Sequence, residues 1–374
     1  MKAREYNIER IVYVAGAASR ARTAKEYIEF LYPTAKVTAF LVSPEMEIKT
    51  SCIAKTPVIA LDKQQIDNRK LDITAPVFIA TKNIYWDKLE EELSDCGFTN
   101  IHPMDVQLDT YLRIEYIKVK YYEMGKRFQL IDDLNSNGAR KATIEGRIYV
   151  ASASTDKSLQ EKYLYGKEEE SIHLGAELIQ DNNEPGLKDN LGKATENISE
   201  LNGQFCELTG LYWIWKHATE DYIGLVHYRR HFILPTNWID ICDANNIDVI
   251  LPVPLYVGPS LAADYKRRHV AKDWDILMEY LQSHFPDEYW DMRKFFEGNF
   301  YNPCNMLIAR KSIIDDYCKW LFPIVFTIYK NIGDRKDSYQ RRYPGFMAER
   351  LMSYYFDKNK DRLKIVYANK NFLS

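Results

Sequence analysis

The stretch that decides the fold is residues 197–231, NISELNGQFCELTGLYWIWKHATEDYIGLVHYRRH. Apolar side chains recur every three or four residues over 207–217, which predicts a helix with one buried face. The apolar run at 221–226, DYIGLV, predicts a buried strand directly after it. A helix followed closely by a buried strand indicates an α/β unit, and this strand leads into a polar segment that runs from His227 to Arg230.

Strand-like and helix-like runs alternate over about the first 125 residues. Strands are expected at 10–16, 36–43, 56–63 and 75–81, and helices at 22–32 and 83–97. This alternation predicts a mostly parallel, doubly wound sheet. The turn after the first strand contains Gly16 alone, whereas a dinucleotide fingerprint needs several glycines, so a Rossmann-like domain with a structural or partner-docking role is favoured over nucleotide binding.

The chain has 374 residues, which favours two domains over one. A polar-faced helix is expected at 108–128, followed by loop-forming residues at 132–138 and a new strand at 147–152. We therefore expect a Rossmann-like accessory domain at 1–128, which includes the bridging helix, and a second α/β domain at 147–374.

Composition excludes several classes of protein. The formal net charge of −3 provides no global basic field for nucleic acid or an anionic membrane. Six dispersed cysteines without a CxxC pair indicate reduced thiols rather than disulfides or a zinc site. The polar start of the chain is unlike a signal peptide, and no apolar run approaches the roughly 20 residues of a membrane span. We expect a cytoplasmic protein, at most peripheral to a membrane or to a biosynthetic complex, with no nucleic-acid partner.

The polar segment after the 221–226 strand suggests a phosphate site. Strand alternation would place His227 and Arg229 on one side, where many single-sheet glycosyltransferases carry an Asp-x-Asp that holds a divalent cation. Cationic side chains at these positions, together with Arg230, would instead contact the diphosphate of a nucleotide-sugar donor directly. No metal ligand is assigned, and a bound Mn²⁺ or Mg²⁺ would not be held by Asp-x-Asp. The alternative is an arginine–carboxylate network at the edge of the sheet.

Further candidates follow from residue type and spacing. In the basic segment 264–274, Tyr265, His269 and Asp273 recur every four residues, so one helix would stack them for acceptor or phosphate contacts, or present them as a solvated face. The remaining polar candidates for nucleotide or sugar contacts are Asn197, Asn202, Glu207 and Asn305. For Glu207 the alternative is a partner of the helix dipole.

An inverting sugar transfer requires a carboxylate that accepts the proton of the acceptor hydroxyl. Glu349, in a helix expected to begin near Phe346, is the first candidate, although a lone helical glutamate is more often solvated. Asp273 is the second candidate, with Asp334 and Asp337 as further ones. Arg341 and Arg342 would stabilise the leaving diphosphate.

Seven segments resemble a known family of capsular-polysaccharide and lipopolysaccharide glycosyltransferases marked by an HYRR motif, long catalogued as a domain of unknown function. The matching segments are SIHLGAEL (171–178), DNLGKATENISELN (189–202), CELTGLYWIWK (206–216), DYIGLVHYRRHF (221–232), NMLI (305–308), YCKWLFPI (317–324) and GFMAERL (345–351). Together they cover about residues 147–357 and are jointly specific.

The resemblance implies a GT-A-like glycosyltransferase domain after the Rossmann-like one. It implies transfer of a hexose, with galactose or galactofuranose among relatives, from a nucleotide-diphosphate sugar, UDP-linked, to a surface-polysaccharide precursor. The acceptor would be a glycan or a lipid-linked oligosaccharide at the inner face of the membrane. Relatives carry a Thr-His-Lys-like motif after the first strand of this domain, whereas residues 151–154 here are Ala-Ser-Ala-Ser.

Two hypotheses compete with this reading. One is an NAD-dependent enzyme that modifies a sugar nucleotide with the first domain, which the single Gly16 disfavours. The other is an inactive module that binds a sugar nucleotide, which the departure at 151–154 favours.

Overall fold

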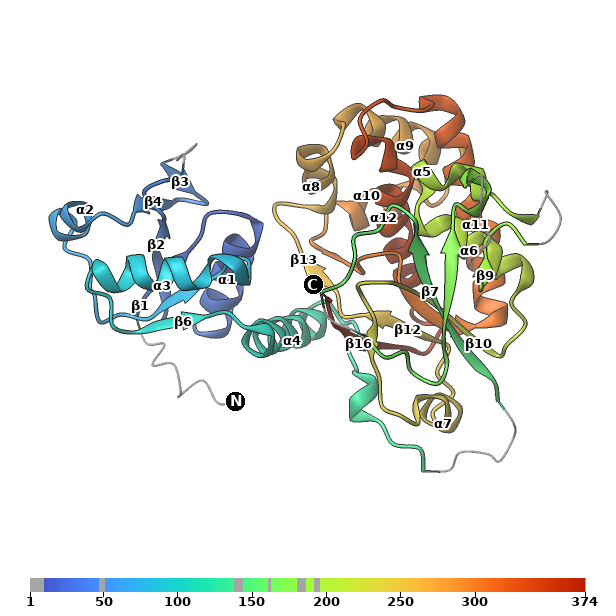
Figure 1. The fold of residues 1–374 in the computed structure, drawn as a ribbon, viewed down its shortest axis with the longest axis horizontal. Helices are drawn as coiled ribbons and strands as arrows, with labels where there is room; N and C mark the ends of the chain where they lie inside the picture. The colour runs from blue at the N-terminus through green and yellow to red at the C-terminus, as the bar shows by residue number, and fades with distance from the viewer. Residues whose placement is uncertain are drawn as a thin grey trace. The chain divides into compact units, whose positions relative to one another are not determined.

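The computed structural model describes residues 10–46, 51–137, 144–160, 163–179, 186–191 and 196–373. The chain forms two compact units, Met1–Arg127 and Phe128–Ser374, each with a sheet of its own (Figure 1). The polar start of the chain, Gly138 of the predicted loop and residues 192–195 of the second family segment lie outside the described residues.

Unit 1 is built on a six-stranded sheet in the order β3-β4-β2-β1-β5-β6. All neighbours are parallel except β3 and β4, so the predicted alternation and the mostly parallel sheet are confirmed. The strands are β1 (Ile11–Ala15), β2 (Lys36–Val42), β3 (Cys52–Ile53), β4 (Thr56–Ala60), β5 (Val77–Ile79) and β6 (Ile101–Pro103). The helices are α1 (Ser19–Leu31), α2 (Lys63–Asn68), η2 (Asn83–Tyr85), α3 (Trp86–Asp95) and α4 (Val106–Glu123).

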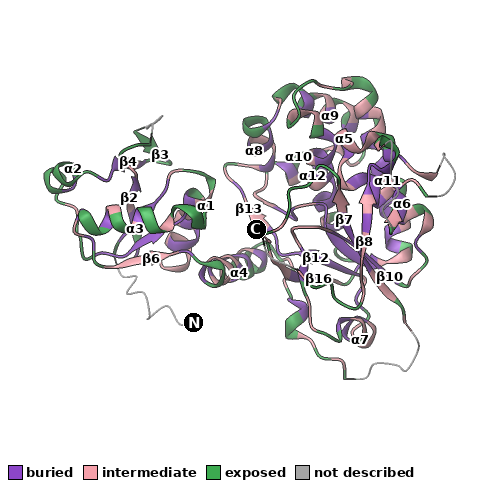
Figure 2. Cartoon of the chain, viewed as in Figure 1, coloured by how far each residue is buried: buried purple, intermediate pink, exposed green. Residues whose placement is uncertain are grey.

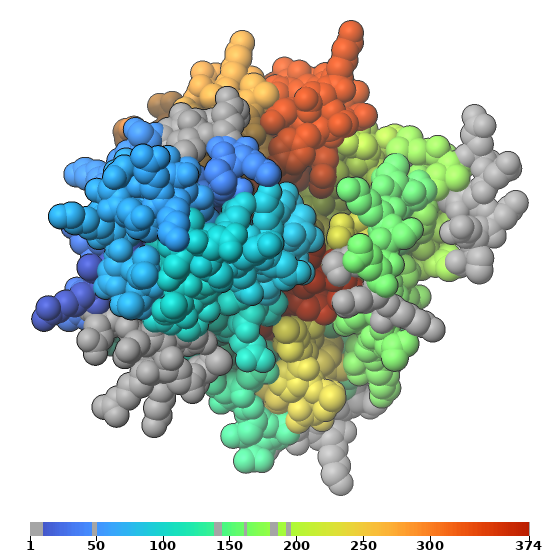
Figure 3. Space-filling view, turned by 60° about the vertical axis from the view of Figure 1, so that its left-hand side comes forward, coloured from blue at the N-terminus to red at the C-terminus, as the bar shows by residue number. Residues whose placement is uncertain are grey.

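Helix α4 differs from the predicted bridging helix at 108–128. It begins at Val106, after the side chain of Asp105 accepts a hydrogen bond from the backbone N–H of Leu108, and it ends at Glu123. Gly125 follows with φ of 65°, a left-handed conformation that ends helices and that glycine adopts without strain. The whole helix lies within unit 1, where it contacts α1. Together with α3 it forms part of the surface of that unit (Figure 3).

The strand order of unit 1 reverses between β1 and β5, the position where doubly wound sheets commonly bind nucleotides. Here the Arg20 guanidinium donates hydrogen bonds of 2.7 Å to the carbonyls of both Thr81 and Met104, just beyond the ends of β5 and β6. Arg20 thus ties the strand ends together at this edge.

Unit 2 is built on an eight-stranded sheet in the order β11-β16-β12-β15-β10-β7-β8-β9, in which β15 and β11 run antiparallel to their neighbours. Its strands are β7 (Gly146–Ala153), β8 (Glu169–Leu174), β9 (Leu187–Lys188), β10 (Tyr222–His227), β11 (Phe232–Ile233), β12 (Val249–Pro252), β15 (Leu307–Arg310) and β16 (Ile365–Lys370). A separate ribbon pairs β13 (Leu255–Tyr256) with β14 (Phe300–Tyr301).

Helices lie on both faces of this sheet: Gly210 packs against Leu225 of β10, whereas Trp238 packs against Tyr222, which points to the other face of the same strand. The helices are α5 (Asn202–Phe205), α6 (Glu207–His217), α7 (Trp238–Ala244), α8 (Leu261–Arg268), α9 (Ala271–His284), α10 (Tyr289–Phe296), α11 (Lys311–Ile332) and α12 (Tyr343–Lys358). Short 3-10 turns are η3 (Ile131–Asp133), η4 (Ala176–Leu178), η6 (Ser199–Leu201) and η7 (Gln340–Arg342). Helix α6 contacts β7, β8 and β10; most of β10 and the middle of β7 are buried, whereas β8 is mostly half-buried (Figure 2).

The prediction of one helix through 264–274 is wrong. Helix α8 ends at Arg268, His269 is extended, and α9 begins at Ala271. Three successive cationic residues, 266–268, form the last turn of α8, where positive charge is favoured by the helix dipole. Tyr265 and His269 nevertheless remain close, with ring centroids 4.8 Å apart.

None of the helices in the described parts of the chain is both long enough and apolar enough to cross a membrane.

Gly224, in the central strand β10, provides a test of the packing of unit 2. A Cβ atom there would lie 2.8 Å from Ile308 Cγ1 and 3.2 Å from Ile148 Cγ1. We expect Gly224→Ala to reduce the free energy of unfolding by about 1–3 kcal/mol through overpacking. Urea unfolding followed by tryptophan fluorescence measures this, because Trp86 is the only tryptophan of unit 1.

The control is Gly166→Ala, where the nearest atom to a new Cβ would be 3.7 Å away. Equal unfolding midpoints for the two variants would contradict the tight packing of β10 against its neighbours.

Candidate functional site

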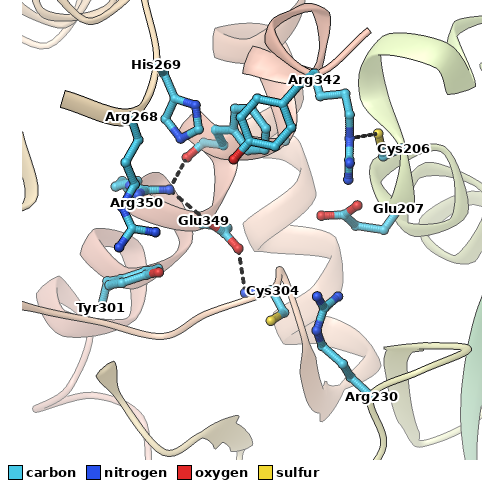
Figure 4. Close-up of a pocket in the computed structure, with 13 residues that line it drawn as sticks. Cys206, Glu207, Arg230, Arg268, His269, Tyr301, Cys304, Arg342, Glu349 and Arg350 are labelled. Atoms are coloured by element: carbon cyan, nitrogen blue, oxygen red, sulfur yellow. Dashed lines mark hydrogen bonds and ion pairs between the residues drawn. The ribbon is translucent and has the colours of Figure 1, made fainter. Parts of the chain in front are cut away.

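A cavity of about 290 Å³ lies in unit 2 beyond the carboxyl end of β10 (Figure 4). It is formed by the turn after β10, the start of α6, the end of α8, β14 with the turn that follows it, and the segment from Tyr339 through the first turns of α12. The lining residues are Cys206, Glu207, Arg230, Arg268, His269, Tyr301, Cys304, Tyr339, Arg342, Gly345, Phe346, Glu349 and Arg350.

The turn after β10 brings Arg230 to this cavity. The backbone N–H of His227 donates to the Arg230 carbonyl at 3.1 Å, and that of Arg230 donates to the His227 carbonyl at 3.0 Å. The strand therefore ends at His227, and the predicted alternation of His227 with Arg229 is wrong. Arg229 lies outside the described lining, where its Nε donates to the Leu373 carbonyl at 3.1 Å.

His227 is a neutral link rather than a cation. Its Nε2 lies 2.6 Å from the carbonyl oxygen of Cys304, which can only accept, so Nε2 carries the hydrogen. Burial lowers the pKa of His227, which keeps the ring uncharged at neutral pH. The ring thus joins the end of β10 to the turn before β15, and the prediction of a cationic phosphate ligand at this position is wrong.

Two carboxylates face the cavity. Glu349 accepts a hydrogen bond of 2.7 Å from the backbone N–H of Cys304 and one of 2.8 Å from Arg350 Nη1. Glu207, the first residue of α6, accepts one of 2.7 Å from Asn305 Nδ2. Burial raises the pKa of Glu349 against the opposing effect of Arg350, and the nearby charge of Glu207 raises it further. A carboxylate with a raised pKa in a cleft is a candidate base.

Positive charge exceeds negative charge in the lining. Four arginines, Arg230, Arg268, Arg342 and Arg350, outnumber Glu207 and Glu349. Burial lowers the pKa of His269 to about 4, so its ring is neutral at neutral pH. The cavity is therefore suited to an anion that can accept charge-assisted hydrogen bonds. Within the described residues, no group of three or more His, Cys, Asp or Glu side chains could hold a metal ion.

The fully buried carboxylate of Asp264 orients two of these arginines. Its Oδ1 accepts hydrogen bonds from Arg267 Nη2 at 2.5 Å and from Arg268 Nε at 3.0 Å, and its Oδ2 lies 3.6 Å from Arg350 Nη2. Sequence reasoning did not single out Asp264, although its spacing of four residues from Arg268 in a basic helix could have indicated the pair.

Two cysteines, Cys206 and Cys304, also line the cavity. Burial raises the pKa of Cys206 and of Cys304 to about 11, so both thiols are protonated at neutral pH. Cys206 contacts the cavity arginine Arg342, whose Nε lies 3.0 Å from its Sγ. Burial therefore disfavours a thiolate at both positions.

Glu207, Arg230, His269, Arg342 and Glu349 are the sequence-predicted residues that line the cavity.

Three further predicted residues, all asparagines, lie outside the described lining. Asn305, which holds Glu207, also donates to the Gly345 carbonyl at 3.1 Å. Asn202 Nδ2 donates to the Cys206 carbonyl at 3.1 Å and so fixes the chain before α6. Asn197 Oδ1 accepts from the backbone N–H of Ser199 at 3.2 Å. Asn197 and Asn202 thus bond to nearby backbone, whereas Asn305 joins Glu207 of α6 to Gly345 of α12.

Two predicted residues face elsewhere. Asp273 is buried and paired with Arg335, outside the described lining, so it is not placed to act as a base in this cavity. Arg341 lies 3.6 Å from Asp334 and is likewise outside that lining.

Sequence reasoning missed Arg268, Arg350 and the rings of Tyr301, Tyr339 and Phe346. Arg350 directly follows Glu349, so the pair itself was a visible signal. Tyr339 and Phe346 lie seven residues apart in one segment, whereas Tyr301 comes from β14, so no local pattern joins all three rings.

Comparisons with known proteins give two similarities to this chain. The sequence profile of a domain of unknown function, DUF4422, matches residues 147–360. The apo structure of the WbbM bifunctional glycosyltransferase is similar at a TM-score of 0.52 and 24% identity, over 61% of this chain. The match covers 45% of the WbbM chain, so it concerns a part of that protein. No curated protein matches the sequence.

Asp264 provides a test of the arginine cluster. We expect Asp264→Asn to reduce the free energy of unfolding by about 3–5 kcal/mol, because the buried Arg350 loses a compensating charge. Asp275→Asn is the control: Asp275 pairs with Lys266 at 2.6 Å, but its side chain is 54% exposed. That variant should change stability by about 0–1 kcal/mol. Similar losses in both variants, measured by urea unfolding, would contradict the anchoring role of Asp264.

Proposed function

The chain belongs to the DUF4422 family, and from this premise we propose that it is a glycosyltransferase that uses a nucleotide-diphosphate sugar. The observation that carries the proposal is the cavity beyond β10, where four arginines surround two carboxylates. The fold similarity to a bifunctional glycosyltransferase supports the same class of reaction. In α/β sheets, ligands bind beyond the carboxyl ends of strands, which is where this cavity lies.

Arg230 and Arg342 bind the donor diphosphate in this proposal. Figure 4 shows their guanidinium groups on the side of the cavity where Glu207 lies. Planar guanidinium groups bind phosphate oxygens through paired hydrogen bonds, and the start of α6 adds the positive end of a helix dipole. These groups hold the diphosphate without an Asp-x-Asp motif.

Glu349 is the proposed base. It accepts the proton of the acceptor hydroxyl while the acceptor oxygen forms a bond to the anomeric carbon and the nucleoside diphosphate leaves with the bonding electrons. The hydrogen bond from the Cys304 N–H fixes the carboxylate, and burial raises its pKa toward neutral pH. Glu207, held by Asn305, would accept hydrogen bonds from hydroxyls of the donor sugar.

The finer assignment rests on the family resemblance of the segments between 147 and 357. We propose a UDP-linked hexose, galactose or galactofuranose, as the donor and a surface-polysaccharide precursor as the acceptor, either a glycan or a lipid-linked oligosaccharide. The transfer would take place in the cytoplasm at the inner face of the membrane. The domain at 147–374 carries the activity, and the Rossmann-like domain at 1–128 is accessory.

The diphosphate site can be tested with Arg230→Gln and Arg342→Gln. Each change removes charged hydrogen bonds worth about 1.5–3 kcal/mol, so UDP should bind roughly 10- to 150-fold more weakly by titration calorimetry. The control is Arg293→Gln, which removes an exposed arginine of α10 that pairs with Glu297. Unchanged UDP affinity in both cavity variants would place the nucleotide elsewhere.

The base can be tested with Glu349→Gln, which keeps the shape of the side chain. We expect turnover to fall about 10²- to 10⁴-fold while UDP affinity stays nearly constant. In the unaltered enzyme, activity should be lost as pH falls through the raised pKa, which places the acid limb of kcat above the ordinary value near 4.5. Full turnover in the variant would remove Glu349 as base, and UDP binding without turnover in the unaltered chain would indicate an inactive binding module.

A further inference from the structure

Three rings form one wall of the cavity, which we call the aromatic wall: His269, Tyr339 and Phe346. The His269 ring lies 4.0 Å from Phe346 at an interplanar angle of 19°, and 5.7 Å from Tyr339 at 27°. Tyr339 and Phe346 are themselves 5.1 Å apart. The His269 ring is therefore nearly parallel to each of the other two, whereas Tyr339 and Phe346 are inclined to each other by 42°. The other lining groups of the cavity are mostly charged.

The aromatic wall is fixed in place and uncharged. Asp337 Oδ1 accepts hydrogen bonds from the backbone N–H groups of Tyr339 at 2.9 Å and Gln340 at 2.7 Å. Gln340 Nε2 in turn donates to the Arg268 carbonyl at 3.2 Å, which ties this turn to the end of α8. These contacts anchor the segment that carries Tyr339, and such preorganisation lowers the entropic cost of binding a ligand.

The combination of groups selects the class of ligand. A sugar ring has an apolar face of C–H groups and a rim of hydroxyls, so it needs a flat apolar surface beside strong hydrogen-bonding groups. Glu349, Arg350 and Tyr301 supply such groups in the same cavity. A purely apolar ligand would displace water from these polar groups without offering hydrogen bonds in return, which is costly.

We propose that the aromatic wall binds the sugar ring of the acceptor, with Tyr339 as its outermost contact. The inference rests on the proposed function and names the acceptor subsite of the same cavity. Tyr339 is 51% exposed, so a sugar at the end of a chain reaches it from solvent. The guanidinium carbon of Arg342 lies 5.8 Å from the ring centroid of Phe346. An acceptor on the aromatic wall is therefore next to the proposed diphosphate site.

Saturation-transfer NMR with methyl β-galactoside, in the presence of UDP, tests this subsite in the full chain. Protons on one face of the sugar should receive most of the saturation in the unaltered protein and in Tyr339→Phe. Tyr339→Ala should bind the glycoside about 2- to 12-fold more weakly, the range expected for loss of one ring contact. The control is Trp290→Ala, which removes another exposed ring, on α10 and outside the described lining, and should leave binding unchanged.

Any of the following results would overturn the inference. No transfer to the glycoside in the unaltered protein, or equal binding by Tyr339→Ala, means that the aromatic wall does not hold the acceptor. A second arm uses UDP-galactose alone: if Tyr339→Ala loses saturation of its hexose protons while the glycoside still binds, the wall serves the donor sugar. Calorimetry with UDP separates these failures from failure of the proposed function, because absence of UDP binding contradicts the glycosyltransferase itself.

Discussion

The hydrogen bond between the His227 ring and the Cys304 carbonyl is the interaction on which the cavity depends. It joins the end of the central strand β10 to the turn that precedes β15, at a distance of 2.6 Å. Cys304 has φ of 75° and Asn305 has φ of 49°, so two successive left-handed residues turn the chain sharply here. That conformation lets the Cys304 carbonyl meet His227 while its N–H meets Glu349. Such strain persists where the surrounding structure supports it, commonly at functional sites.

From Glu349 the polar contacts continue through the interior. Arg350 bonds to Glu349 at 2.8 Å and lies 3.6 Å from Asp264, which in turn holds Arg268 at 3.0 Å. Strand β10, the turn before β15, and helices α12 and α8 are therefore linked by one chain of polar groups. Buried ions of this kind cost desolvation energy unless they are paired, and each carboxylate here has a cationic or N–H partner.

This network explains how a chain with a net charge of −3 can form a positive cavity. The carboxylate of Asp264 is fully buried behind the arginines, whereas Arg230 and Arg342 approach the cavity from other elements. Local geometry, rather than composition, thus creates the anion site. The same arrangement gives the proposed transferase positive charge for a leaving diphosphate and a carboxylate of raised pKa beside it.

The sequence by itself determined the elements whose periodicity is strong. The helix predicted at 207–217 is α6, the strand predicted at 221–226 lies within one residue of β10, and the parallel sheet of unit 1 follows its alternating pattern. Residue chemistry also identified Glu207, Arg230, His269, Arg342 and Glu349, which line the cavity. In a helix or strand the residues of the buried face recur at a fixed spacing, so a short stretch of sequence is enough to reveal the element.

Only the tertiary structure decided which polar residues meet. The strand ends at His227 because the chain turns back on itself there, which sends Arg230 rather than Arg229 to the cavity. Asp273 is paired with Arg335 instead of facing substrate, and Asp264 orients arginines that the sequence pattern left unassigned. These outcomes depend on contacts between residues far apart in the chain, where the choice of partner is set by packing and by the cost of burying an unpaired charge.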